Sequence, residues 1–169
     1  MDGDKRIVGS PVWSEPSGTD RRLRFVAPLV FRGRVMQGLE LVGRAHADLP
    51  FRDLSLTLIY MPTSNRRGAV QLARVDWRPK VTHANDYPRC PPHLLGLDLD
   101  GDHHHSFDLN WSTGSGRLLV GLPIAEPIKP QFQSFDELVD GVGALFKISN
   151  AAADIPSPWP PDLFASHGL

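Results

Sequence analysis

The sequence predicts an α+β protein, in which one C-terminal amphipathic helix packs on a mainly antiparallel β-sheet of hairpins in meander order, either open or barrel-like. Three observations support this class. Runs typical of strands occur before residue 78, short turns separate those runs, and a helical apolar period occurs once, after residue 134. The length of 169 residues, with 41% hydrophobic and 22% charged residues, suits one folded domain.

A first hairpin is expected from residues 23–31 and 35–47. Both are apolar runs, and the short turn between them contains Gly33, a pattern typical of a hairpin. Pro28 has no backbone N–H to donate, so it should lie on an edge strand or at a bulge.

Two further strands are expected at residues 54–61 and 70–77. The first alternates between apolar and polar residues, as a half-buried strand does. In the second, the period of two places Arg74 and Asp76 on one face and Trp77 on the other.

The middle of the chain is less regular. Residues 78–93 contain several prolines and no period, so they form a long loop, and loops of this length in a compact domain are often functional. Residues 94–99 and 106–111 are expected to pair as a hairpin that turns at Gly101, and residues 117–122 to form a further short strand.

The predicted helix begins after Ser134, which forms a capping box with Glu137. Its apolar positions follow the helical spacing i, i+3, i+4, i+7: Phe135, Leu138, Val139, Val142, Leu145 and Phe146. Gly141 and Gly143 each cost about 1 kcal/mol in a helix relative to alanine. Close packing on the sheet is the expected reason for their presence.

Three segments are expected along the chain: a loose leader at residues 1–20, a single domain at 21–150 and a proline-rich tail at 151–169. A residue that precedes proline avoids the helical region, so residues 155–164 of the tail should be extended. Trp159 and Phe164 are expected to pack across the body of the domain.

Localisation and redox state follow from what the sequence lacks. No run of about 18 apolar residues is present, so no membrane contact is expected. The first residues lack the apolar core of a secretory signal, and the single cysteine suits a reducing compartment. A cytoplasmic location is therefore expected.

Charge is divided unevenly along the chain. Residues 1–90 hold 15 Lys and Arg against 9 Asp and Glu, whereas residues 91–169 hold 3 against 10. Such a division suggests an arginine-rich face for phosphates, or an acidic C-terminal half that binds a basic protein partner. The alternative is that the two signs neutralise one another in the folded chain.

Histidines concentrate between Arg74 and Trp111, where five of the seven occur. In a strand, His103 and His105 would project to one face, and His83 or His93 could supply a third imidazole. The spacing matches no standard zinc signature and a single cysteine makes no thiolate site, so no cofactor is predicted, although a divalent metal at the cluster stays open. A third alternative is a set of solvated histidines at a turn.

The same residues suit metal-independent cleavage of a phosphodiester. Histidine can act as general base and general acid because its unperturbed pKa is near 6.5. The candidate catalytic residues are His83, His93, His103, His105, Arg74 and Asp76. Arg74 or Arg78 would hold the phosphate, and Asp76 would orient an imidazole or form an ion pair with Arg74. Trp77 could stack on a base, although an aromatic residue there is more often in the core.

The order R-x-D-W, H-x-N, P-H and H-x-H resembles small bacterial proteins of the TumE-like toxin group and related uncharacterised families. The match covers residues in the range from Arg74 to His105: Arg74, Asp76, His83, Asn85, His93, His103 and His105. It departs from the pattern in that Ala84-Asn85 follows the first histidine, and the strands before Val70 have no counterpart. The resemblance implies a toxin–antitoxin setting with RNA as target, and places Asn85 with Arg78 and Trp77 among the substrate-binding candidates.

Two functions of different classes follow from these patterns. The first is an RNA-cleaving or RNA-binding protein of a bacterial toxin–antitoxin or defence module, a possible endoribonuclease. The alternative is a non-catalytic interaction module, such as an antitoxin, an immunity factor or a subunit of a larger assembly.

Overall fold

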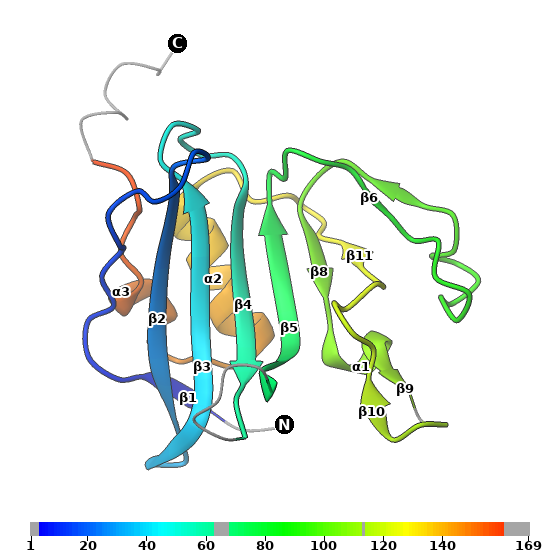
Figure 1. The fold of residues 1–169 in the computed structure, drawn as a ribbon, viewed down its shortest axis with the longest axis horizontal. Coiled ribbons are helices and arrows are strands. Elements are labelled where there is room, and N and C mark those ends of the chain that lie inside the picture. The colour runs from blue at the N-terminus through cyan, green and yellow to red at the C-terminus, as the bar shows by residue number, and fades with distance from the viewer. Residues whose placement is uncertain (1–3, 63–67, 113, 161–169) are drawn as a thin grey trace.

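The computed structural model describes residues 4–62, 68–112 and 114–160, and it confirms the α+β class. Seven strands form one antiparallel sheet in the order β1-β2-β3-β4-β5-β8-β11 (Figure 1). They are β1 (Lys5–Ile7), β2 (Arg22–Phe31), β3 (Arg34–His46), β4 (Leu54–Tyr60), β5 (Val70–Trp77), β8 (His103–His105) and β11 (Glu126–Pro127). The sheet is open in the described part of the chain, with β1 and β11 as its end strands, so the barrel-like alternative is not realised.

The smaller elements flank this sheet. Two short strand pairs lie beyond β8: β6 (His83–Ala84) with β7 (Asp98–Leu99), and β9 (Trp111–Ser112) with β10 (Arg117–Leu118). The helices are α1 (Phe107–Asn110), α2 (Phe135–Phe146) and α3 (Ala151–Asp154). No helix within the described ranges is long and apolar enough to cross a membrane.

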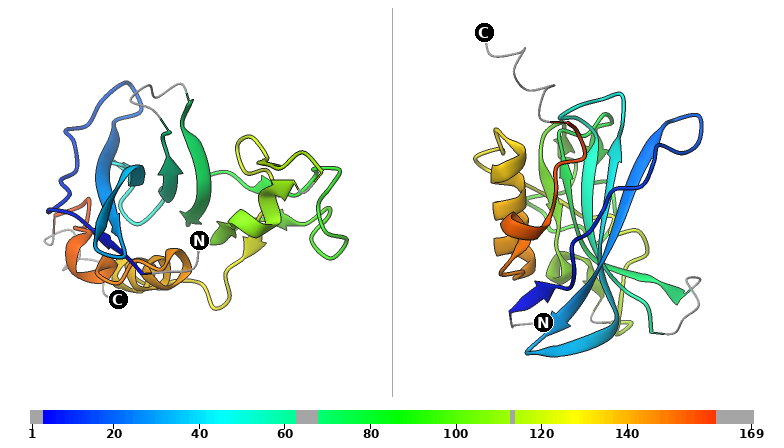
Figure 2. Two further views of the ribbon diagram at one scale, coloured as in Figure 1. Left: turned by 90° about the horizontal axis from the view of Figure 1, so that it is seen from below. Right: turned by 90° about the vertical axis from the view of Figure 1, so that its left-hand side faces the viewer.

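Two of the helices, α2 and α3, cover the same face of the sheet (Figures 1 and 2). Strand alternation sends the large apolar side chains to this inner face, where Phe25, Leu41 and Leu56 are almost fully buried against the apolar side of α2. The opposite, outer face carries polar and charged residues on the same strands. The functional residues described below lie on that outer face.

The strands expected before residue 78 are confirmed. The register shifts between Pro28 and Val30 in the β2–β3 pair, so the proline sits at an irregularity, as expected for a residue without a backbone donor. The segment expected to be a loose leader contributes β1, which pairs with β2.

The hairpin expected from residues 94–99 and 106–111 is wrong. Gly101 lies at a bend, but β7 pairs with β6, and β8 begins only at His103 and inserts between β5 and β11. Ser106 then ends the strand, because its Oγ accepts a hydrogen bond from the Leu109 N–H and caps α1. The strand expected at residues 117–122 is reduced to β10.

The C-terminal helix begins at the predicted cap, Ser134, but the Glu137 side chain bonds the residue before Ser134 rather than Ser134 itself. Ser134 Oγ accepts from the Glu137 N–H at 3.1 Å, and the Glu137 carboxylate accepts from the Gln133 N–H at 2.8 Å. Both glycines are closely packed, although against the chain that flanks the helix rather than against the sheet. A Cβ on Gly141 would lie 2.3 Å from the Phe132 ring, and one on Gly143 would lie 3.1 Å from a carbonyl oxygen.

Trp159 of the tail packs on the body of the domain, as expected. Its indole is 3% exposed, lies near Phe51, Trp77 and Phe135, and donates from Nε1 to the His46 carbonyl at 3.2 Å. Phe164 lies outside the described residues.

Candidate metal centre

The pairing of β5 with β8 brings two sequence patterns together. Arg74 lies opposite His105, and Asp76 lies opposite His103, all on the outer face of the sheet. Both patterns have a period of two, so each places two side chains on the same face. The R-x-D and H-x-H motifs therefore form a four-residue patch across two neighbouring strands.

The Asp76 carboxylate is the centre of this patch. Its Oδ2 lies 3.2 Å from His103 Nε2 and 3.1 Å from His105 Nε2. The same oxygen accepts a hydrogen bond from Arg74 Nε at 2.8 Å. Three side chains from two strands thus converge on one oxygen atom.

Main-chain carbonyls fix the other side of both imidazoles. His103 Nδ1 lies 2.8 Å from the Gly101 carbonyl oxygen, and His105 Nδ1 lies 2.6 Å from that of Leu122. A carbonyl only accepts, so each Nδ1 carries the proton and donates. In the neutral ring, Nε2 then has a lone pair directed toward Asp76.

His83 completes the group from outside the main sheet. It lies on β6, and its Nε2 is 3.1 Å from the Pro123 carbonyl oxygen. Its ring stacks on His103 with centroids 5.3 Å apart and meets His105 edge-on at 4.7 Å. One ring nitrogen from each of these three histidines lies within 4.8 Å of those of the other two.

Two buried asparagines hold the backbone that carries these contacts. Asn85 is fully buried, and its amide donates to the Ala125 carbonyl and accepts from the Ala125 N–H. Asn110 makes the same pair of contacts with Ile124. Asn85 was predicted to bind substrate, but both ends of its side-chain amide are used in these hydrogen bonds to Ala125.

The charges in the group act on one another. Burial alone would raise the pKa of the Asp76 carboxyl, but its contacts with His103 and His105 and the charge of Arg74 outweigh burial and hold that pKa far below its ordinary value. Burial lowers the pKa of His105, and burial followed by the charge of His103 lowers the pKa of His83. Asp76 is therefore ionised at neutral pH, and a second proton on His105 is disfavoured.

The groups of this centre need positive charge between them. A carboxylate oxygen and an imidazole lone pair repel each other at 3.1–3.2 Å unless a proton or a cation lies between them. Arg74 supplies part of that charge, since its Nη2 lies 2.7 Å from His105 Nε2. His103 Nε2 faces the same carboxylate oxygen.

A metal ion would suit Asp76 Oδ2 and the two imidazole nitrogens that face it, and a ring nitrogen of His83 lies within 4.8 Å of one in each of those two histidines. Ligands placed tetrahedrally at 2.0–2.1 Å from an ion lie roughly 3.3 Å apart, close to the 3.1–3.2 Å that separates Asp76 Oδ2 from the two imidazoles. Imidazole rings whose other nitrogen donates to a carbonyl are the usual ligands of such ions, because that bond fixes the tautomer and the ring orientation. Imidazole and carboxylate together suit zinc, iron, copper or nickel.

The centre reaches the surface through Asp76. The His103 and His105 side chains are 2% and 0% exposed, whereas those of Asp76 and Arg74 are 17% and 24% exposed. Asp76 also lies in the wall of a hollow of about 490 Å³ on the outer face. A ligand would therefore approach along the sheet rather than through the imidazoles.

The remaining predicted site residues lie elsewhere. His93 is exposed on the long loop and is not a member of the three-histidine group. Arg78 donates to the Gln133 carbonyl at 2.9 Å and lies over the Trp77 ring. Trp77 is 0% exposed within the core, and a ring without exposed surface cannot stack on a base, so its predicted role in substrate binding is wrong.

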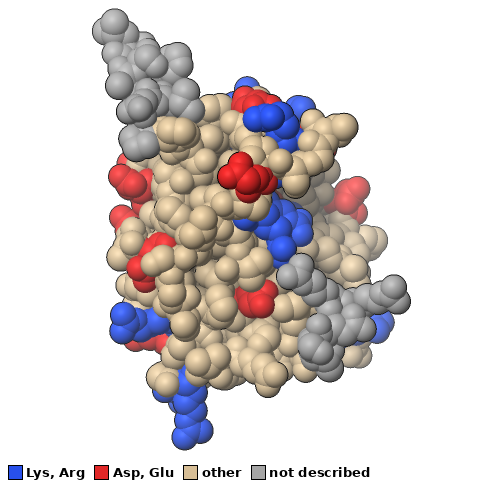
Figure 3. Space-filling model, turned by 60° about the vertical axis from the view of Figure 1, so that its left-hand side comes forward, with Lys and Arg blue, Asp and Glu red and all other residues tan. Residues whose placement is uncertain are grey.

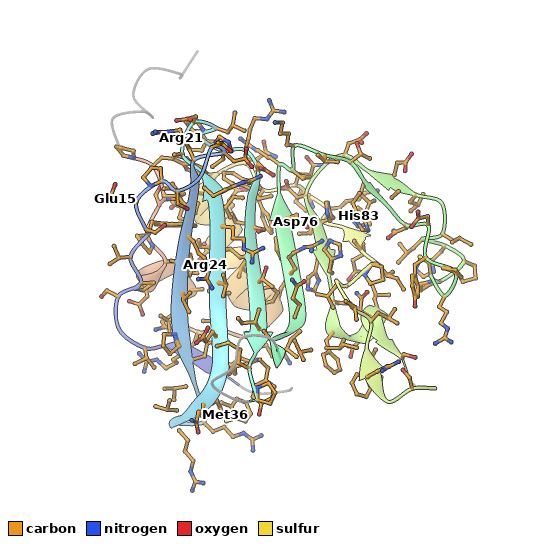
Figure 4. All side chains as sticks on the ribbon, in the orientation of Figure 1. Glu15, Arg21, Arg24, Met36, Asp76 and His83 are labelled. Carbon is orange, nitrogen blue, oxygen red and sulfur yellow. The ribbon has the colours of Figure 1, made fainter. Side chains whose placement is uncertain are left out.

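Two groups near the centre were missed by sequence reasoning. Arg24 and Arg44 line the hollow beside Asp76. Figure 4 labels Arg24 and Asp76 on their strands. Their signal was present in the alternation of β2 and β3, but the register that places them beside Asp76 requires three strand pairings. The carbonyls that orient the rings carry no side-chain signal at all.

Comparisons with models of known protein families, with curated proteins and with solved structures found no significant match.

Proposed function

We propose that this protein binds one divalent transition-metal ion at His83, His103, His105 and Asp76, and uses the ion to activate water for hydrolysis. One observation carries the proposal. The imidazoles of His103 and His105 are held by main-chain carbonyls and present their other nitrogens to one ionised carboxylate oxygen. A ring nitrogen of His83 lies within 4.8 Å of one in each of these two histidines.

The residues divide into two roles. The three imidazoles can hold an ion through their ring nitrogens and leave a further position for water, whose pKa such an ion lowers to about 7. Asp76 is ionised and half-buried, so it can either join the ligands or accept a hydrogen bond from that water. Arg74 must move away from His105 for an ion to bind, and its partial exposure gives the long side chain room to do so.

A second function is favoured by the Arg74 contact. A guanidinium 2.7 Å from His105 Nε2 would hold a phosphate beside an imidazole, as metal-free cleavage of RNA requires. The burial of His103 and His105 weighs against it, because a general acid or base must reach the proton that it transfers. The interaction-module hypothesis stays a prediction, and the exposed acidic residues of α2 are its available surface.

Calorimetric titration of the EDTA-stripped protein with ZnCl₂ tests the metal centre. One ion per chain is expected, with affinity at least 100-fold weaker in His103→Ala. His83→Ala provides a second test, because His83 is only half-buried and lies on a short strand outside the main sheet, so this variant should fold.

His93→Ala is the matched control, since it removes an exposed histidine from the same loop region. It should bind zinc like the wild type. The proposal is wrong if the wild type binds no zinc, cobalt or nickel, or if His83→Ala binds them equally well. Incubation with total RNA separates the two chemistries: cleavage in EDTA that His105→Ala abolishes would support the metal-free function.

A further inference from the structure

The hollow beside the metal centre is lined by arginines. It has a volume of about 490 Å³, within the usual range for small-molecule sites. Arg22, Arg24 and Arg44 line it together with Asp76 of the centre. Lys and Arg side chains gather near the middle of the view in Figure 3, with acidic side chains beside them. We call the hollow lined by Arg22, Arg24, Arg44 and Asp76 the arginine hollow.

The strand register connects the arginines to the centre in one row. Arg24 lies opposite Arg44, Arg44 opposite Ser55, Ser55 opposite Asp76, and Asp76 opposite His103. Neighbouring strands are 4.7–4.9 Å apart, so about 10 Å separates the backbones of Arg44 and Asp76. A molecule that lies along this row can contact the arginines at one end and the centre at the other.

The Arg24–Arg44 pair is suited to an anion. Like charges directly opposite each other on two strands destabilise a sheet, and a shared anion relieves that repulsion. The guanidinium fork matches the geometry of phosphate oxygens. Two carboxylates also line the hollow: Asp53 accepts from Arg22 at 2.7 Å, and Asp76 from Arg74 at 2.8 Å.

Space is present on both sides of the pair. A second hollow of about 330 Å³ is lined by the same two arginines and by apolar side chains such as Ile59 and Met61. A phosphate on the pair could therefore carry an organic group toward the centre, away from it, or both. This geometry suits a phosphate monoester and a phosphodiester alike.

We propose that Arg24 and Arg44 bind a phosphate group of the substrate, so that the substrate class is an organic phosphate of about nucleotide length. The phosphate would be held about 10 Å from Asp76, and the part of the molecule beyond it would reach the metal centre. The reaction at that end rests on the proposed function, whereas phosphate binding needs no metal.

Titrations in EDTA test the arginine pair by itself, with ¹⁵N–¹H NMR shifts as the readout. The probes are inorganic phosphate, adenosine 5′-monophosphate, the dinucleotide ApA and adenosine. The nucleotides are expected to bind at least tenfold more tightly than adenosine. Tighter binding of the monophosphate than of ApA would identify a phosphate monoester as the natural form, and the reverse order would identify an internal linkage of RNA.

Arg44→Gln should weaken binding of the phosphate-bearing probes at least tenfold. Arg34→Gln is the matched control, because Arg34 is exposed at the start of β3, near the β2–β3 turn and away from the hollow, and it should bind like the wild type. The inference is overturned if inorganic phosphate, the monophosphate and ApA all fail to bind, or if Arg44→Gln binds them equally well. Zinc titrations of the same variants should be unchanged, so a failure of the phosphate site is distinguishable from a failure of the metal centre.

Discussion

Asp76 Oδ2 accepts from one guanidinium and faces two imidazole nitrogens, all within 3.2 Å. An ion in this position would compete with Arg74, because both supply the positive charge that the carboxylate and the lone pairs need. At an effective dielectric constant of 20, two unit charges 4 Å apart interact by about 4 kcal/mol, and partial exposure reduces that figure.

Arg74→Met should therefore strengthen zinc binding by about tenfold, since it removes a neighbouring cation and keeps a long side chain. Calorimetric titration compares the variant with the wild type. Arg78→Met is the control, because its guanidinium binds the Gln133 carbonyl instead of the centre. An unchanged affinity in Arg74→Met would show that Arg74 does not compete with the ion.

His104 points away from its two neighbours, into the inner face of the sheet. Its ring lies 6.0 Å from that of Phe146, and its Nε2 is buried without a hydrogen-bond partner in the described residues. Burial, followed by the charge of His105, lowers the pKa of His104 to about 4. The unfolded chain, with a pKa near 6.5, binds this proton more readily.

The free energy of unfolding should consequently fall as the pH drops from about 6.5 to 4, by up to about 3 kcal/mol from His104 alone. Urea unfolding in EDTA at pH 7 and pH 4.5 measures this difference. His104→Phe should show a smaller loss than the wild type, whereas His93→Phe should keep the full loss. Equal losses in all three proteins would contradict the assignment to His104.

At the scale of single elements, the start of α2 depends on the side chain of Ser134. Its Oγ satisfies the Glu137 N–H, one of the four amide groups that the first turn of a helix leaves without a partner. Ser134→Ala should lower the free energy of unfolding by about 1 kcal/mol. Chemical denaturation checks this, with exposed Ser10→Ala as a control that should change little.

Strands β2 to β5 and helix α2 were predictable because each has a local period that decides its own conformation. Strand β8 was not, because it consists of three histidines that are all buried and has no apolar alternation. Its position depends on pairing with β5 and β11, which come from distant parts of the chain. The same holds for the centre: His103 and His105 were expected to share a face, but no local pattern separates His83, which joins them, from His93, which does not.

At the scale of the whole molecule, the centre links the main sheet to the strand pair beside it. His83 comes from the β6–β7 pair beyond β8, whereas Asp76 comes from the main sheet. An ion that binds both would tie the outlying segment to the sheet. Helix α2 covers the other face of the sheet (Figure 1). The arginine hollow extends from Asp76 across the face that α2 leaves uncovered.

Zinc should accordingly stabilise the folded chain by about 2.7 kcal/mol when the free ion is at 100 times its dissociation constant. Thermal unfolding with zinc and with EDTA measures the effect, and amide exchange should slow most in residues 78–101. His83→Ala should lose this slowing while His93→Ala keeps it. Stabilisation of His83→Ala equal to that of the wild type would mean that the ion binds elsewhere.

The carbonyls of Gly101, Leu122 and Pro123 have a consequence for how this chain can vary. Every amino acid carries a carbonyl, so no replacement at these three positions deletes the acceptor that orients a ring. The orientation of the imidazoles therefore does not depend on which side chains these three positions carry. Only an altered backbone path, such as an insertion or deletion between residues 101 and 123, would release them, so related chains should vary in sequence there more readily than in length.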